Sequence, residues 1–168
     1  SIRLYAKWIK ANAEYDNFEA YTDTTGYDPW SESAVPSLNT DTAYVFDGAN
    51  SLKIDVAAKT TYKQNYATLC KQGTFNRAGD GISFWIKSET AVDLLFALND
   101  QNKTYEVSVP SGRNMVTIPW DEFTAAGTAD SWWCMFFRVK TADKTIANTV
   151  YIDSIGTYSD STDRILTY

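Results

Sequence analysis

The chain has 168 residues, and its 15 Lys and Arg against 21 Asp and Glu give a formal net charge of −6 at pH 7. This length predicts one domain over residues 1–168, with a core over residues 14–158 and ends that form an edge strand or a linker. The negative charge argues against nucleic acid and an anionic membrane as partners. No apolar run approaches the ~18 residues of a membrane-spanning helix, and the first residues lack the apolar stretch of a secretion signal.

The chain contains no histidine, which excludes nucleophile systems that use an imidazole base and the usual catalytic zinc sites. Its two cysteines, Cys70 and Cys134, cannot form a Cys₄ metal site or a CxxC redox pair. They form either a disulfide or two thiols, and the sequence leaves both open. Any chemistry must come from carboxylates, tyrosine, lysine or an oxygen-liganded metal.

Short segments with period-2 alternation recur along the chain, separated by turn signals such as Asp47-Gly48. They predict strands at residues 42–46, 51–56, 61–70, 81–87, 92–99, 104–109, 114–119, 132–140 and 149–158. One helical turn is expected near residues 121–126. Strands at this spacing predict an all-β fold, an antiparallel β-sandwich (jelly roll) of two sheets with a concave ligand face.

Alternation in the predicted strand 132–140 puts Trp132, Phe136 and Arg138 on one face and Trp133 on the other. An unpaired guanidinium is too costly to bury, so the face with Arg138 is not deep core. We therefore expect Trp132 and Phe136 to form a half-exposed aromatic surface.

Aromatic residues make up 15% of the chain. Aromatic faces stack well on the apolar C–H side of sugar rings, and this stacking needs no charge, which suits a neutral polysaccharide. We expect rings on a concave sheet to stack on a β-1,4-linked chain, while planar polar groups hydrogen-bond its hydroxyls. The residues expected to contact the ligand on this ground are Trp30, Tyr62, Gln64, Tyr66, Asn99, Glu106, Trp132, Phe136 and Arg138.

Core packing is the alternative for each of these rings, because aromatic residues of β-proteins most often pack inside. Trp85 and Trp120 are expected to be structural, since each lies at the end of a predicted strand.

Five segments in order resemble bacterial β-jelly-roll carbohydrate-binding modules of the family 11 and family 30 type, related to families 4 and 22. The segments are DNFEAY (16–21), DGANSLKIDV (47–56), GISFWIKS (81–88), NMVTIPWDEF (114–123) and TVYIDSIGTY (149–158). The resemblance implies a noncatalytic, secreted, monomeric module. It would hold a covalently linked glycoside hydrolase on plant cell-wall chains of the β-glucan, xylan or xyloglucan type.

The same resemblance implies a structural calcium ion, with Asp16, Glu19, Asn50 and Asp153 as ligands together with carbonyl oxygens of Ser51 or Lys53. Calcium takes six to eight hard oxygen ligands, which suits this set. The alternative is that Glu19 and Asp153 are solvated acids at strand ends. The segment 21–39 also resembles a variable loop that flanks the cleft in relatives, which implies that Tyr27 or Trp30 contacts the ligand.

Two other functions fit parts of the sequence. Glu14, Asp16 and Glu19 spell E-x-D-x-x-E, the string that carries the nucleophile and acid of family-16 glycoside hydrolases. On an extended strand, however, Glu14 and Asp16 share a face that Glu19 does not. The second alternative is a protein-recognition β-sandwich of the cohesin or adhesion type.

Overall fold

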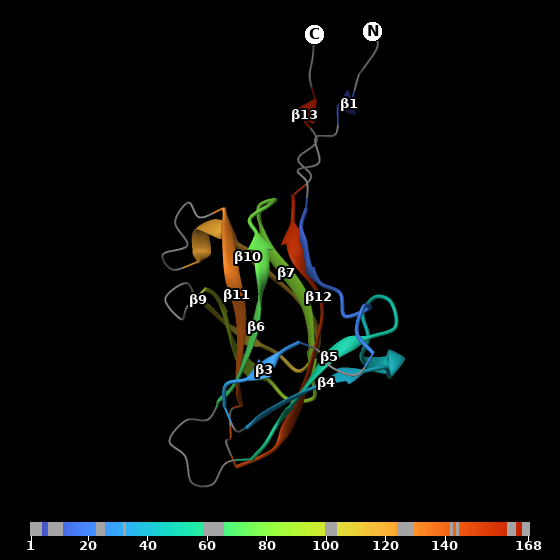
Figure 1. Cartoon of the computed structure of the whole chain (residues 1–168), viewed down its shortest axis with the longest axis vertical. Helices are drawn as coiled ribbons and strands as arrows, with labels where there is room; N and C mark the ends of the chain where they lie inside the picture. The colour runs from blue at the N-terminus through green and yellow to red at the C-terminus, as the bar shows by residue number, and fades with distance from the viewer. Residues whose placement is uncertain are drawn as a thin grey trace.

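The computed structural model describes residues 5–6, 12–22, 26–31, 33–58, 66–99, 104–123, 130–141, 143, 145–160 and 164–165, and no side chains at 5–6, 66, 141 and 164–165. Two antiparallel sheets pack face to face, as the alternating pattern predicts (Figure 1). The all-β sandwich expected from the sequence is confirmed. None of the residues described belongs to a helix long and apolar enough to cross a membrane.

The larger sheet has six strands, five of them in the order β10-β7-β12-β5-β4, with β2 paired to the C-terminal part of β12. Its strands are β2 (Glu14–Asp16), β4 (Ala34–Asn39), β5 (Ser51–Val56), β7 (Gly81–Ser88), β10 (Gly112–Pro119) and β12 (Asn148–Tyr158).

The smaller sheet has five strands in the order β3-β6-β11-β8-β9, so β11 lies at its centre. Its strands are β3 (Asp28–Pro29), β6 (Tyr66–Asn76), β8 (Val92–Leu98), β9 (Thr104–Val109) and β11 (Ser131–Thr141). Two short strands, β1 (Tyr5–Ala6) and β13 (Arg164–Ile165), pair in a separate sheet.

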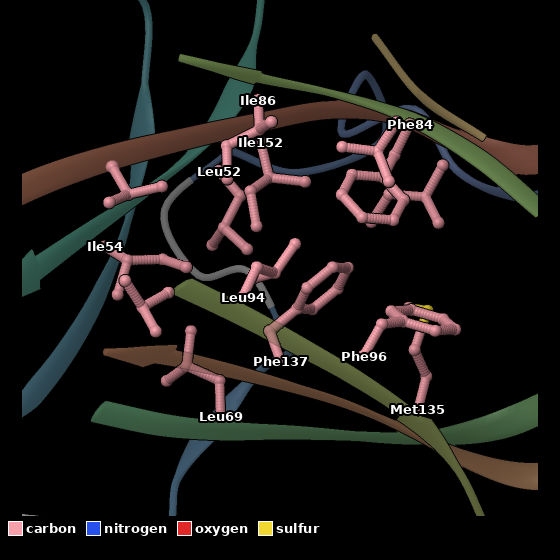
Figure 2. Close-up of a cluster of buried hydrophobic side chains, with 14 of the residues drawn as sticks. Leu52, Ile54, Leu69, Phe84, Ile86, Leu94, Phe96, Met135, Phe137 and Ile152 are labelled. Carbon is pink, nitrogen blue, oxygen red and sulfur yellow. The ribbon is translucent and has the colours of Figure 1, made fainter. Parts of the chain in front are cut away.

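The core fills the space between the two large sheets. Inward positions alternate with outward ones along each strand, so β7 buries Ile82, Phe84 and Ile86. Figure 2 shows side chains from both sheets pointing toward one another, with Phe84 and Ile86 on one side and Phe137 on the other. The burial of this apolar surface is the main force that holds the sheets together.

The predicted strands at 51–56 and 104–109 have the bounds of β5 and β9. The strand predicted at 42–46 is wrong: Thr42–Tyr44 form a 3-10 turn (η1), capped by Asp41, whose Oδ1 accepts from the Ala43 N–H at 3.0 Å. A second 3-10 turn, η2, lies at Trp120–Glu122, where one helical turn was expected.

Strand β4 is not among the predicted strands, and Pro36 lies in its middle. Proline lacks the N–H of a ladder donor and is tolerated only at edges and bulges of sheets. β4 is indeed the last strand of its sheet, which explains why the proline is accommodated.

Candidate functional site

The candidate site is the outer face of the five-stranded sheet, here called the groove face. Register aligns Arg138 of β11 with Leu95 of β8 and with Glu106 of β9 across the sheet. The same register aligns Lys140 with Asp93 and Ser108. Outward side chains on this face belong to Trp30, Asp93, Leu95, Glu106, Ser108, Phe136, Arg138 and Lys140.

A hollow of about 520 Å³ opens over β8, β9 and β11 at this face. Asp93, Glu106, Ser108, Arg138 and Lys140 supply its polar lining. The Ser108 hydroxyl donates to Asp93 Oδ1 at 2.6 Å, which fixes one carboxylate at the wall. The hollow therefore offers carboxylate and hydroxyl acceptors beside guanidinium and ammonium donors, a mixture that suits a ligand with many hydroxyl groups.

Trp30 lies beside this polar region and is 53% exposed. Its indole packs edge-to-face on Phe136, with ring centroids 4.7 Å apart and an interplanar angle of 73°. The backbone N–H of Trp30 donates to the Thr68 carbonyl at 2.8 Å, which ties this segment to β6. The ring is thus held in place while much of its surface stays in water.

Phe136 is only 2% exposed, so the expected half-exposed surface is wrong for this residue. It lies in a small cluster on the groove side of the sheet with Cys70, Ala97, Cys134 and Leu95. Phe136 supports Trp30 from below, so its side is as predicted while its exposure is not.

Trp132 is also buried, at 2% exposure, and stacks on Trp120 in the core at 5.0 Å. The physical reason is a register shift between β6 and β11, where Trp132 pairs with Phe75 but Cys134 pairs with Gln72. The shift turns Trp132 toward the interior although Cys134 faces the groove. A bulge re-aims side chains in this way, and strict alternation cannot anticipate it.

Tyr27 does not reach the groove face either. It is 4% exposed and packs in the core against Phe18 and Phe137. Burial is the main cause that raises the pKa of its phenol, and the negative charge of Asp16 raises it further. The expected ligand contact of Tyr27 is therefore corrected to a core contact.

Asn99 lies at the end of β8 and acts on the backbone of β11. Its Oδ1 accepts from the Trp133 N–H at 2.9 Å, and its own N–H donates to the Cys134 carbonyl at 3.0 Å. Tyr62 and Gln64 fall outside the described residues. The backbone of Tyr66 pairs with Lys140, and its side chain is outside the description.

Trp133, which alternation assigned to the interior, is 56% exposed. It is the residue that the sequence analysis missed, and the signal for it is the register shift rather than any local motif.

The two cysteines are present as thiols, both with 0% exposure, in the cluster beneath Trp30. Burial raises the pKa of the Cys70 thiol and the negative charge of Asp28 adds to this, whereas a hydrogen bond with Cys134 lowers it. The Cys134 Sγ also donates to the Asn99 carbonyl. They lie on the neighbouring strands β6 and β11, under the groove face.

The four side chains expected to hold calcium do not act as one set. Asp16 is buried and forms an ion pair with Lys71, whose Nζ also donates to the Tyr21 hydroxyl. In the part of the chain that the structure describes, no three acidic or cysteine side chains form a group that could hold a metal ion. Asp16 is therefore paired with a cationic side chain of the chain itself.

Glu19 and Asp153 instead both reach the turn at residues 46–50. Glu19 Oε1 accepts from the N–H groups of Ala49 and Asn50, at 3.0 and 2.8 Å. Asp153 Oδ2 accepts from the Phe46 N–H at 2.7 Å. Burial raises the pKa of the Asp153 carboxyl most, backbone N–H donors lower it, and the charge of Glu19 raises it further. A cation beside Glu19 and Asp153 would relieve that repulsion.

The E-x-D-x-x-E string lies away from the groove face. Glu14 and Asp16 belong to β2 of the six-stranded sheet. Asp16 is paired with Lys71, and Glu19 with the turn at 46–50. A retaining glycosidase needs two carboxyl groups free to act on either side of one sugar bond, and these contacts do not provide that arrangement.

A second aromatic cluster covers the outer face of the six-stranded sheet. Phe46 stacks on Trp85 with centroids 3.8 Å apart, and Tyr44 stacks on Tyr151 at 4.2 Å. The Lys87 ammonium lies over the Tyr44 ring at 4.2 Å and donates to the Ala43 carbonyl at 3.3 Å. Here the rings of the loop at 42–46 occupy the faces of the rings on the sheet.

No protein-family model matches the sequence, and no curated protein matches it. The structure is similar to the family 11 carbohydrate-binding module from Clostridium thermocellum in complex with a β-1,3-1,4-mixed-linked tetrasaccharide. That match has a TM-score of 0.60 and 17% identity, and it covers 88% of this chain and 95% of that chain. A family 28 module described as specific for non-crystalline cellulose matches with a TM-score of 0.53 and 16% identity, over 77% of this chain and 86% of that chain.

An exo-β-agarase matches with a TM-score of 0.66 and 14% identity, over 90% of this chain but only 25% of the enzyme's chain. At sequence identities this low, the matches show that the folds are similar and do not identify a ligand. The chain therefore has the jelly-roll β-sandwich fold of carbohydrate-binding modules such as those of families 11 and 28.

Proposed function

We propose that this protein is a noncatalytic carbohydrate-binding module that holds single β-1,4-linked chains of plant cell-wall polysaccharide on the groove face. The observation that carries the proposal is Trp30, a half-exposed indole fixed on Phe136 beside a hollow lined by polar groups. An indole face offers stacking area to a sugar ring, and the neighbouring donors and acceptors suit its hydroxyls.

The polar residues divide the hydrogen bonding by charge. The Arg138 guanidinium and the Lys140 ammonium donate to hydroxyl oxygens, while the Glu106 carboxylate accepts from hydroxyl hydrogens. Because a solvated groove gives up good hydrogen bonds to water, we expect modest affinity, with Kd on the order of 10–100 μM.

A modest affinity suits a module that is tethered to a larger partner, since a linker raises the effective concentration of the second site. We propose a glycoside hydrolase in the same polypeptide as that partner, secreted to reach its substrate. The match of this chain to about a quarter of the exo-β-agarase chain supports this arrangement.

Affinity electrophoresis tests the proposal with soluble mixed-linkage β-glucan, xyloglucan, xylan and glucomannan in separate gels. The wild-type protein is expected to be retarded by at least one of them, and Trp30→Ala to lose about tenfold or more in affinity, which is about 1.4 kcal/mol. Val35→Ala is the matched control, because Val35 is also 53% exposed but lies on β4 of the other sheet. Wild-type mobility that no glycan changes would overturn the proposed function.

We also propose a structural calcium ion held by the carboxylates of Glu19 and Asp153, with Asn50 in the same turn. When bound, the ion would neutralise the two acids and cross-link β12 to the turn at 46–50. Melting curves with calcium and with EDTA test this: calcium is expected to raise Tm in the wild type and not in Glu19→Gln. Equal Tm values in both buffers would refute it.

A further inference from the structure

The backbone around Trp133 is held by an unusual residue. Asn99 has a φ of 64°, in the left-handed region that non-glycine residues adopt only at a cost in free energy. From there its Oδ1 accepts from the Trp133 N–H at 2.9 Å, although the β8–β11 ladder ends at Leu98. The Asn99 N–H and carbonyl both bond to Cys134, the next residue of β11.

The register shift places the neighbouring residues Trp132 and Trp133 in different environments. Between Trp132 and Cys134, β6 advances by three residues, from Phe75 to Gln72, while β11 advances by two. Trp132 turns inward as a result, and Trp133 is left with 56% of its surface exposed. Bulges of this kind commonly re-aim a side chain next to a functional site.

The Trp133 indole is exposed although hydrogen bonds hold the backbone around it, so local flexibility does not explain its exposure. Leaving the apolar surface of an indole in water forgoes the free energy that its burial would have contributed. The three contacts of Asn99 fix the chain where that area stays open. Such an arrangement is expected of a ring kept ready for a ligand.

We propose that Trp133 is a second stacking platform of the groove face and that Asn99 is its positioning residue; this rests on the proposed function. Trp133 is three residues from Phe136 on β11, which places it about 10 Å along the strand from the ring pair of Phe136 and Trp30. A bound glycan must then be long enough to contact both Trp30 and Trp133.

Calorimetric titration with β-1,4-linked oligosaccharides, from disaccharide to hexasaccharide, tests the proposal. The oligosaccharides are fragments of whichever polysaccharide the wild-type protein binds. Wild-type affinity is expected to rise with length until the ligand contacts both rings. Trp133→Ala is expected to lose about tenfold for the longest ligand and nothing for the disaccharide. Trp133→Phe should recover part of the loss, and Ile146→Ala, at another exposed position, should match the wild type.

Asn99→Ala should reproduce the length-dependent loss of affinity seen in Trp133→Ala. Asn99→Asp keeps the acceptor oxygen, so its affinity should rise with ligand length as in the wild type. If Asn99 were purely structural, Asn99→Ala would lower Tm, but its affinity would rise with ligand length as in the wild type. If wild-type protein binds no glycan, the proposed function fails and this inference with it. If wild-type protein binds and Trp133→Ala keeps the full gain with length, only the second platform is refuted.

Discussion

The outer faces of the two sheets both carry aromatic residues, but they use them in opposite ways. On the six-stranded sheet, Phe46 stacks on Trp85 and Tyr44 on Tyr151, and Lys87 covers Tyr44. On the five-stranded sheet, Trp30 and Phe136 meet in a single edge-to-face contact, and Trp30 remains 53% exposed.

The difference teaches that the number of aromatic residues on a face does not mark a binding site. Rings that stack face to face already have each other as partners, and the chain's own loop takes the place a ligand would need. An edge-to-face pair lacks the full face-to-face cover of a stack, and more than half of the Trp30 surface stays exposed. The groove face is the candidate site because the Trp30 ring is held on Phe136 there while 53% of its surface stays exposed.

The largest expected effect comes from Trp85→Ala, which removes the support of Phe46. A fully buried tryptophan costs about 3–5 kcal/mol on replacement by alanine, and Trp85 is half-buried, so we expect a loss of about 2 kcal/mol in the free energy of unfolding. Urea denaturation measures it. Glycan binding should stay as in the wild type; a variant that unfolds normally and no longer binds would reverse the roles of the two faces.

Arg138→Ala should have the opposite profile, with weaker binding and a smaller loss of stability than Trp85→Ala. A hydrogen bond to a ligand is worth about 1 kcal/mol net, so we expect roughly a fivefold rise in Kd by calorimetry. Arg138→Lys keeps a cation and should lose less affinity.

Because the proposed ligand is uncharged, the wild-type Kd should hardly change between low and high salt. A steep salt dependence would instead indicate an anionic ligand.

The smallest effect is expected for Lys87→Met on the six-stranded face. The variant keeps most of the apolar stem but removes the ammonium from above the Tyr44 ring. Exposed cation–π contacts contribute about 0.5–1 kcal/mol, so we expect Tm to fall by about 1–4 °C. Binding should not change, and any loss of affinity would place ligand contacts on this face.

Much of the groove face could be predicted from alternation alone. In β9, Glu106 and Ser108 point outward and Val109 inward, as a period of two requires. The cost of burying a guanidinium predicts that Arg138 lies outside the deep core, and Arg138 is half-buried on the groove face. These assignments succeeded because both strands keep a regular register with their neighbours at these positions.

The assignments failed where the register did not stay regular or where the partner was distant in sequence. Trp132 and Trp133 exchanged roles because β6 and β11 slip by one residue between Trp132 and Cys134. Asp16, expected among the calcium ligands, forms an ion pair that the sequence did not predict, with Lys71, 55 positions further along the chain.

The sequence by itself determined the all-β class, the position of most strands and the sides of the regular ones, since these depend on short-range alternation and turn residues. Only the tertiary structure decided which aromatic rings remain open to water. That choice depends on which strands become neighbours, where their register slips and which loop folds back over a sheet. These are contacts between distant residues, and no local pattern encodes them.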